Sequence, residues 1–120
     1  MAGLRTVVYK VPDLNKAKEW YAKAFRTQPY FDEPFYVGFN IGGYELGLLP
    51  YEEDKVIHGN ASTAYWAVDN VEEMLAHLKD LKAEIVEEPM DVGEGVIVAA
   101  VKDPWNNIVG IIDNPFFKIT

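Results

Sequence analysis

The chain has 120 residues, of which 49% are hydrophobic and 25% charged, and its formal net charge is −8. This length and apolar content predict one domain over residues 1–120 with a single core. The acidity argues against nucleic acid as a partner, because Lys and Arg supply most of the affinity for phosphate backbones. No apolar stretch approaches the length of a membrane span and no signal-peptide pattern opens the chain, so we expect a cytoplasmic protein without membrane contact. Cysteine is absent, which excludes disulfides, thiolate catalysis and a cysteine-based zinc site.

The first half predicts a strand, a helix and then three strands. Its first strand is rich in β-branched and aromatic residues and ends at Pro12, which cannot continue a ladder. Apolar residues then recur with the helical period of 3.6, and Asp13 is placed to cap the helix N-terminus. Gly42 and Gly43 both tolerate positive φ and predict a tight hairpin. The expected strands cover residues 4–11, 28–31, 35–41 and 44–49, and the expected helix begins at Leu14.

The second half repeats this order after a polar, acidic connecting loop over residues 51–60. An offset of 57 residues carries Asp13 to Asn70, the expected cap of a second helix, and Leu14 to Val71. The helical stripe survives this offset, which indicates a duplicated unit. The expected strands here cover residues 62–68, 84–87, 96–102 and 107–112.

The duplication predicts an α+β fold of two tandem βαβββ modules, residues 1–50 and 61–120. A sheet that is covered by a helix on one face keeps its other face free to curve around a ligand. We therefore expect a cupped mixed or antiparallel sheet, with the helices on its outer face and a cleft between the modules.

Four segments together resemble the vicinal oxygen chelate superfamily, which includes glyoxalase I, extradiol dioxygenases, fosfomycin-resistance proteins and bleomycin-binding proteins. The resemblance covers nearly the whole chain and implies a homodimer, since family members usually pair across these modules. Asn106 stands where the family's turn usually has Gly, and Asn tolerates left-handed geometry best among the other residues. The segments are VVYKVPDLNKAKEWYAKAF, GGYELGL, YWAVDNVEEMLAHLKDL and VKDPWNNIVGII.

The resemblance also locates the positions where metal-dependent members hold a divalent ion with four ligands. The first-strand position, usually His, falls on Thr6 and Thr63, and the last-strand position, usually Glu, falls on Glu45 and Gly110. A catalytic metal of this kind needs three or four N or O ligands. One carboxylate among four positions does not meet that need, so we expect no metal site and no other cofactor.

The two histidines do not supply the missing ligands. His58 falls in the acidic connecting loop, where an exposed side chain is expected. His77 falls at the edge of the second helical stripe, which favours a surface or partly packed position. No pair of histidines has metal-ligand spacing.

Glu45 is the candidate catalytic residue, because the resemblance places it on the cleft side of its strand. Desolvation there is expected to raise its pKa, so that it acts as a general base or anchors a cationic ligand. The alternative is an exposed or salt-bridged strand carboxylate. The candidate ligand-binding residues are Thr6, Lys10, Thr63, Tyr65 and Trp105. Ordinary β-propensity is the favoured explanation of the threonines, and aromatic residues in strands are more often core.

Three hypotheses for function follow. The favoured one is a metal-free protein of the bleomycin-binding type, which sequesters a small organic molecule of cationic or aromatic character. The second is a glyoxalase-type lyase or isomerase, either metal-dependent through unrecognised ligands or metal-free with Glu45 as base. The third is a structural or regulatory dimer whose cleft is filled by its own aromatic side chains.

Overall fold

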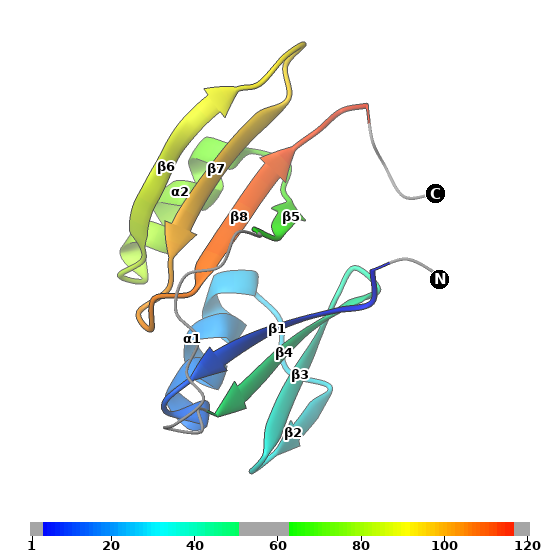
Figure 1. The fold of residues 1–120 in the computed structure, drawn as a ribbon, viewed down its shortest axis with the longest axis vertical. Coiled ribbons are helices and arrows are strands. Elements are labelled where there is room, and N and C mark those ends of the chain that lie inside the picture. Colours follow the sequence, from blue (N-terminus) through cyan, green and yellow to red (C-terminus); the bar gives the residue numbers. More distant parts are fainter. Residues whose placement is uncertain (1–3, 51–62, 117–120) are drawn as a thin grey trace. The chain divides into compact units, whose positions relative to one another are not determined.

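Each half of the chain folds as a strand, a helix and three further strands, as Figure 1 shows. The computed structural model describes residues 4–50 and 63–116, and the chain divides into two compact units, residues 1–59 and 60–120. The predicted α+β fold of two βαβββ modules is confirmed. The first unit contains β1 (Thr6–Val11), α1 (Leu14–Phe25), β2 (Phe31–Glu33), β3 (Tyr36–Ile41) and β4 (Tyr44–Pro50). The second contains β5 (Tyr65–Ala67), α2 (Val71–Asp80), β6 (Glu84–Asp91), β7 (Ile97–Lys102) and β8 (Ile108–Asp113).

The two sheets have equivalent strand orders, β1-β4-β3-β2 in the first unit and β5-β8-β7-β6 in the second. In each, the first strand pairs in parallel with the last one, and the other pairings are antiparallel. Each sheet is therefore mixed. The helix of each unit packs on one face of its own sheet, so the opposite face receives no helix from the same unit.

Both helices begin at the predicted caps. The side chain of Asp13 accepts a hydrogen bond from the Lys16 N–H at 3.1 Å, and that of Asn70 accepts one from the Glu73 N–H at 2.9 Å. Such bonds satisfy backbone donors that have no partner within the helix.

The core of each unit lies between its helix and its sheet. In α1 the predicted stripe buries Ala17, Tyr21 and Ala24, and the ring of Tyr21 stacks on that of Tyr9 with centroids 5.6 Å apart. Strand alternation buries every second residue against the helix, because successive side chains of a strand point to opposite faces. The buried strand residues include Val11, Val37, Phe39, Leu46 and Leu48 in the first unit and Ala99, Val101, Val109 and Ile111 in the second.

The turn between β7 and β8 is organised by Asp103, whose side chain is buried at 3% exposure. Its Oδ1 accepts from the N–H groups of Trp105 and Asn107, both at 2.8 Å, and its Oδ2 accepts from Asn107 Nδ2 at 3.0 Å. Asn106 has a φ of 71°, which confirms the left-handed geometry predicted for it.

Several predicted strand bounds were wrong. β5 begins at Tyr65, so Thr63 lies before the strand. β6 continues to Asp91 through Pro89, which an edge strand with register shifts tolerates because Pro has no N–H to donate. β2 begins only at Phe31. The connecting loop, and with it His58, lies outside the described residues.

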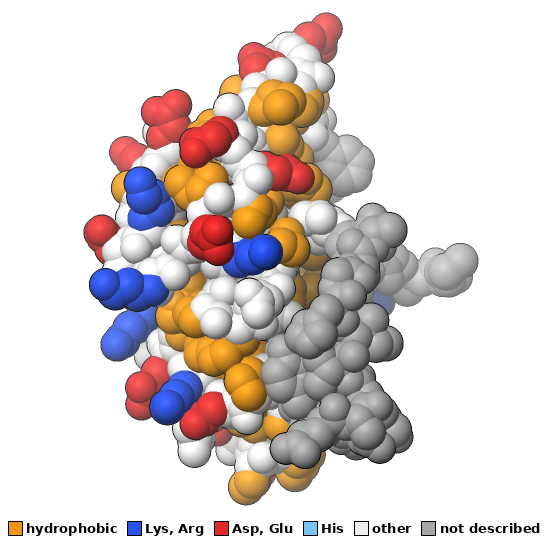
Figure 2. Space-filling model, turned by 60° about the vertical axis from the view of Figure 1, so that its left-hand side comes forward, with side chains coloured by type: hydrophobic (Ala, Val, Ile, Leu, Met, Phe, Trp, Pro, Cys, Tyr) orange, Lys and Arg blue, Asp and Glu red, His pale blue; other side chains and the backbone are white. Residues whose placement is uncertain are grey.

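The surface carries charges of both signs. Figure 2 shows Asp and Glu side chains interspersed with Lys and Arg over the face that it presents, with hydrophobic side chains between them. Across residues 4–50 and 63–116, no helix combines the length and apolar character that a membrane span requires.

Candidate functional site

The helix-free face of the first sheet carries two adjacent rows of side chains. In one row Thr6 of β1, Glu45 of β4 and Asn40 of β3 lie opposite one another. The next row consists of Val8, Gly47, Gly38 and Phe31. Residues that are paired across a sheet point to the same face, so both rows belong to the face without α1.

The carboxylate of Glu45 is the chemical centre of this face. Its Oε1 accepts hydrogen bonds from Thr6 Oγ1 at 3.0 Å and from the hydroxyl of Tyr36 at 2.8 Å. Its Oε2 accepts a hydrogen bond from the hydroxyl of Tyr30. Three neutral hydroxyl donors, each from a different part of the unit, therefore fix one part-buried carboxylate. We call Thr6, Tyr30, Tyr36 and Glu45 the hydroxyl cluster.

Two glycines make this cluster sterically possible. A Cβ atom at Gly47 would lie 2.0 Å from the hydroxyl oxygen of Tyr36, and one at Gly38 would lie 2.9 Å from Glu45 Oε2 and 3.2 Å from Tyr30 Cε1. Gly38 and Gly47 are also paired with each other across β3 and β4. The missing side chains thus leave the space in which the two tyrosines reach Glu45.

Hydrogen bonds to Glu45 shift the pKa of its carboxyl group in the direction opposite to the one expected from desolvation. The bond from Tyr30 is the largest influence on Glu45; with those from Tyr36 and Thr6 it outweighs desolvation, so the pKa is lowered from its ordinary value of 4.5. The predicted rise in pKa was wrong, because three hydroxyl donors from separate parts of the first unit converge on this side chain. Glu45 is therefore ionised at neutral pH.

The two tyrosines shift in the opposite direction. Burial, followed by the hydrogen bond to Glu45, raises the pKa of Tyr36 to about 12. The hydrogen bond to Glu45 is also the main cause that raises the pKa of Tyr30 above 10.0. Both hydroxyls consequently keep their protons and act as donors across the physiological range.

Aromatic rings extend from the hydroxyl cluster towards the edge strand β2. The ring of Phe31 lies 6.1 Å, between centroids, from both Tyr36 and Phe35. Tyr30 and Phe35 are each 63% exposed and Phe31 is 38% exposed. A group of large rings is thus accessible next to a charged carboxylate. We call Tyr30, Phe31 and Phe35 the aromatic edge.

The structure brings one predicted ligand-binding residue, Thr6, into contact with Glu45. Lys10 lies further along β1 and is exposed, opposite Leu49. Thr63, Tyr65 and Trp105 belong to the second unit. Of these, Thr63 and Tyr65 are exposed and Trp105 is half-buried in the Asp103 turn.

In the second unit, Tyr65 and Gly110 occupy the position in the sheet that Thr6 and Glu45 occupy in the first. Gly110 is paired with Tyr65, two residues after Thr63, and a Cβ at Gly110 would lie 2.7 Å from Tyr65 Cδ1. Thr63 and Gly110 therefore do not face each other as Thr6 and Glu45 do. The ring of Tyr65 lies against Gly110, where the metal-dependent pattern requires a carboxylate.

These donors do not fit a divalent metal. Glu45 is a single carboxylate whose partners are neutral hydroxyl donors, and Gly110, the matching position on β8, has no side chain. Among the residues that the structure describes, no three His, Cys, Asp or Glu side chains gather closely enough to hold a metal ion.

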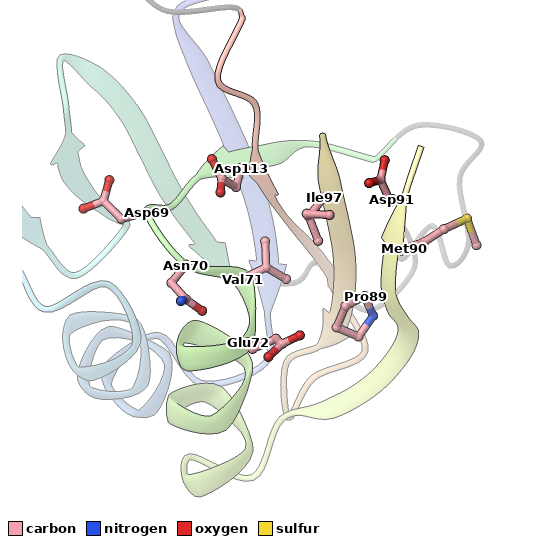
Figure 3. Close-up of a pocket in the computed structure, with 9 residues that line it drawn as sticks. All are labelled: Asp69, Asn70, Val71, Glu72, Pro89, Met90, Asp91, Ile97 and Asp113. Carbon is pink, nitrogen blue, oxygen red and sulfur yellow. The ribbon is translucent and has the colours of Figure 1, made fainter. Parts of the chain in front are cut away.

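A separate hollow of about 370 Å³ lies within the second unit, between the start of α2 and the ends of β6, β7 and β8 (Figure 3). It contains neither Glu45 nor any of the predicted site residues. Its lining combines four carboxylates with apolar side chains: Asp69, Asn70, Val71, Glu72, Pro89, Met90, Asp91, Ile97 and Asp113.

Neither Tyr30 nor Tyr36 is among the site residues predicted from the sequence. Tyr30 precedes β2, where no periodicity predicts which face it takes, and Tyr36 lies in a strand, where aromatic side chains usually belong to the core. The sequence does contain one signal, which is the pair of glycines in the strands around Glu45. Gly47 follows Glu45 by two residues, and Gly38 lies in the preceding strand. Such glycines often mark the close approach of another group.

Comparison with known proteins supports this architecture. Residues 3–111 match the family described as Glyoxalase/Bleomycin resistance protein/Dioxygenase superfamily. The chain is similar to the crystal structure of a glyoxalase-related enzyme from Fulvimarina pelagi, with a TM-score of 0.80 and 18% identity over 100% of this chain and 94% of that one. A fosfomycin resistance protein from Listeria monocytogenes gives a TM-score of 0.80 and 18% identity over 97% and 96%. A superfamily member from Sphaerobacter thermophilus gives 0.77 and 17% over 95% and 98%. No curated protein matches the chain significantly. At these identities the structural likeness shows the fold alone.

Proposed function

The chain belongs to the Glyoxalase/Bleomycin resistance protein/Dioxygenase superfamily, and we propose that it binds a small organic molecule at Glu45 without the help of a metal ion. The observation that carries this proposal is the carboxylate of Glu45, fixed by the hydroxyls of Thr6, Tyr30 and Tyr36 on the helix-free face of the first sheet. A polar group that is held in place among accessible aromatic rings is typical of ligand sites.

Protonation states favour binding over proton-transfer chemistry. A general base works best when its pKa lies near the operating pH. The pKa of Glu45 is lowered and that of Tyr36 is raised to about 12, so both move away from neutrality. The cluster is thus better suited to hold a ligand by fixed charge and hydrogen bonds than to exchange protons with it.

The mode of action that we propose is sequestration, as in the bleomycin-binding type: the ligand is retained and released unchanged. The alternative is a glyoxalase-type enzyme, because a fosfomycin resistance protein and a glyoxalase-related enzyme are among the similar structures. Lys10, Thr63, Tyr65 and Trp105 stay predicted ligand contacts in either case. A cytoplasmic location and a homodimeric assembly also remain predictions. Light scattering after size-exclusion chromatography tests the assembly.

The test is a fragment screen by two-dimensional ¹H–¹⁵N NMR on the chelator-treated full chain. Binding should shift the amide signals of Gly38, Glu45 and Gly47, and the response should be the same before and after addition of zinc or nickel. The variant Glu45→Gln should weaken the response. Glu19→Gln is the matched control, because it removes the same charge from the exposed surface of α1. Binding that appears only with metal, or chemical conversion of a fragment, would instead support the enzyme alternative.

A further inference from the structure

Building on the proposed binding function, we infer that the site at Glu45 selects arylalkylammonium ions, in which a protonated amine is joined to an aromatic ring. Two features of the first unit carry this inference: a carboxylate whose charge no described residue neutralises, and the aromatic edge beside it.

Hydrogen bonds from described residues hold the charge of Glu45 in place without cancelling it. Its partners are the hydroxyls of Thr6, Tyr30 and Tyr36, which are neutral donors. Within residues 4–50 and 63–116, no Lys, Arg or His forms an ion pair with Glu45, and Lys18 of the same unit pairs with Asp32 at 2.9 Å. A fixed, ionised carboxylate without a cationic partner is complementary to a ligand that brings the positive charge.

The hydrogen-bond count favours a cation that carries an N–H group. An ionised carboxylate offers about two acceptor sites on each oxygen. Among the described residues, Oε1 already accepts from Thr6 and Tyr36, whereas Oε2 accepts from Tyr30 only. Gly38 adds no side chain beside Oε2. One acceptor site on Oε2 therefore stays available for an ammonium donor, which a quaternary ammonium group could not use.

The aromatic edge supplies the second half of the selectivity. Phe31 lies in the same row as Gly38, so its ring is on the face that carries Glu45. Large exposed rings cost free energy in water, and they stack readily on a flat ligand. A cation beside such rings also gains from their quadrupole. A ligand with an amine at Oε2 and an aryl group over Phe31 and Phe35 satisfies both features at once.

Three probes of nearly equal shape test the inference on the full chain: benzylammonium, benzyl alcohol and benzoate, titrated by ¹H–¹⁵N NMR at the amides of Gly38, Glu45 and Phe31. Benzylammonium should bind about tenfold more tightly than benzyl alcohol, because both can donate a hydrogen bond to the carboxylate but only the ammonium adds the attraction between opposite charges. Benzoate should bind more weakly than either. This comparison uses the unaltered protein and does not depend on the folding of a variant.

Two variants then assign the preference to one carboxylate. Glu45→Gln should reduce benzylammonium to the affinity of benzyl alcohol, whereas Glu19→Gln should leave the tenfold preference intact; equal losses would mean a general attraction to an acidic protein. Phe35→Ala should weaken the binding of benzylammonium and of benzyl alcohol by similar factors.

Equal binding of the two probes to the unaltered chain, or a preference that survives Glu45→Gln, would overturn the cation inference. If neutral or anionic fragments bind at Glu45 while benzylammonium does not, the binding function stands and only this inference fails. If no fragment binds there, the proposed function fails as well.

Discussion

The hydroxyl of Tyr36 occupies the place where a side chain on Gly47 would begin. A Cβ on Gly47 would lie 2.0 Å from that hydroxyl oxygen and 2.7 Å from the ring carbon that carries it. The same hydroxyl donates to Glu45 at 2.8 Å. The glycine is therefore required by its neighbour on β3, because its own strand conformation would accept any residue.

Gly47→Ala should displace the ring of Tyr36 and break its hydrogen bond to Glu45. The ring is part-buried and cannot give way as easily as a flexible side chain, so the free energy of unfolding should fall by about 1–3 kcal/mol. Urea denaturation measures this change.

The same substitution in a Tyr36→Ala background should cost little, because the group that collides has been removed. A double-mutant cycle isolates this coupling. Equal costs in both backgrounds would show that Gly47 is needed for another reason.

Glu45 should make stability depend on pH at acid values. Its pKa is lowered in the folded chain relative to the ordinary value of 4.5, so it contributes stability above that value and loses the contribution as pH falls through the folded pKa. The difference in the free energy of unfolding between the unaltered chain and Glu45→Gln should therefore shrink as the pH falls below the ordinary value of 4.5. Glu19→Gln corrects for the change in net charge. A difference that grows on acidification would contradict the sign.

Tyr36 should lose its proton at a higher pH than an ordinary tyrosine does. Its pKa of about 12 predicts that the absorbance titration of Tyr36→Phe, subtracted from that of the unaltered chain, contains a tyrosinate with a midpoint near pH 12. The stability that comes from this group is complete below the ordinary value of 10.0 and is lost as pH rises through about 12. In Glu45→Gln the midpoint should move down, since the hydrogen bond to the carboxylate is one cause of the shift. A midpoint of 10.0 in all variants would mean that Tyr36 does not contact Glu45 in solution.

Asp103→Ala should destabilise the second unit by about 2–4 kcal/mol. The buried carboxylate accepts hydrogen bonds from two backbone N–H groups and from Asn107 Nδ2, and its removal leaves these donors without their acceptor. Asp80→Ala is the matched control, because Asp80 lies exposed at the end of α2. Thermal unfolding of both variants measures the difference, and similar melting temperatures would refute the role assigned to Asp103.

The elements that local chemistry determines could be predicted from the sequence. The caps at Asp13 and Asn70 and the left-handed turn at Asn106 depend on neighbouring residues alone, and all three are confirmed. The extent of β6 could not be predicted, because Pro89 is acceptable only on an edge strand. The edge position of β6 is a property of the whole sheet.

The candidate site divides in the same way. Alternation along β4 and the family resemblance both drew attention to Glu45, and its contact with Thr6 follows from the parallel register of β1 and β4. The two tyrosine donors could not be assigned, since Tyr30 comes from a segment without regular structure. The predicted direction of the pKa shift of Glu45 was wrong for the same reason, because that direction depends on how many hydrogen-bond donors reach the carboxylate.

The parallel pairing of β1 with β4 has a consequence for how the first unit is made. β4 is the last strand of the unit to be synthesised, yet it lies in the middle of the sheet, between β1 and β3. Until β4 has left the ribosome, β1 cannot pair with it. Thr6 cannot yet form its hydrogen bond to Glu45, which lies 39 residues further along the chain. Closing so long a loop precedes any gain from the contact. The hydroxyl cluster can therefore form only in a completed first unit, so protection of the Glu45 amide from hydrogen exchange should report the completion of that unit's folding.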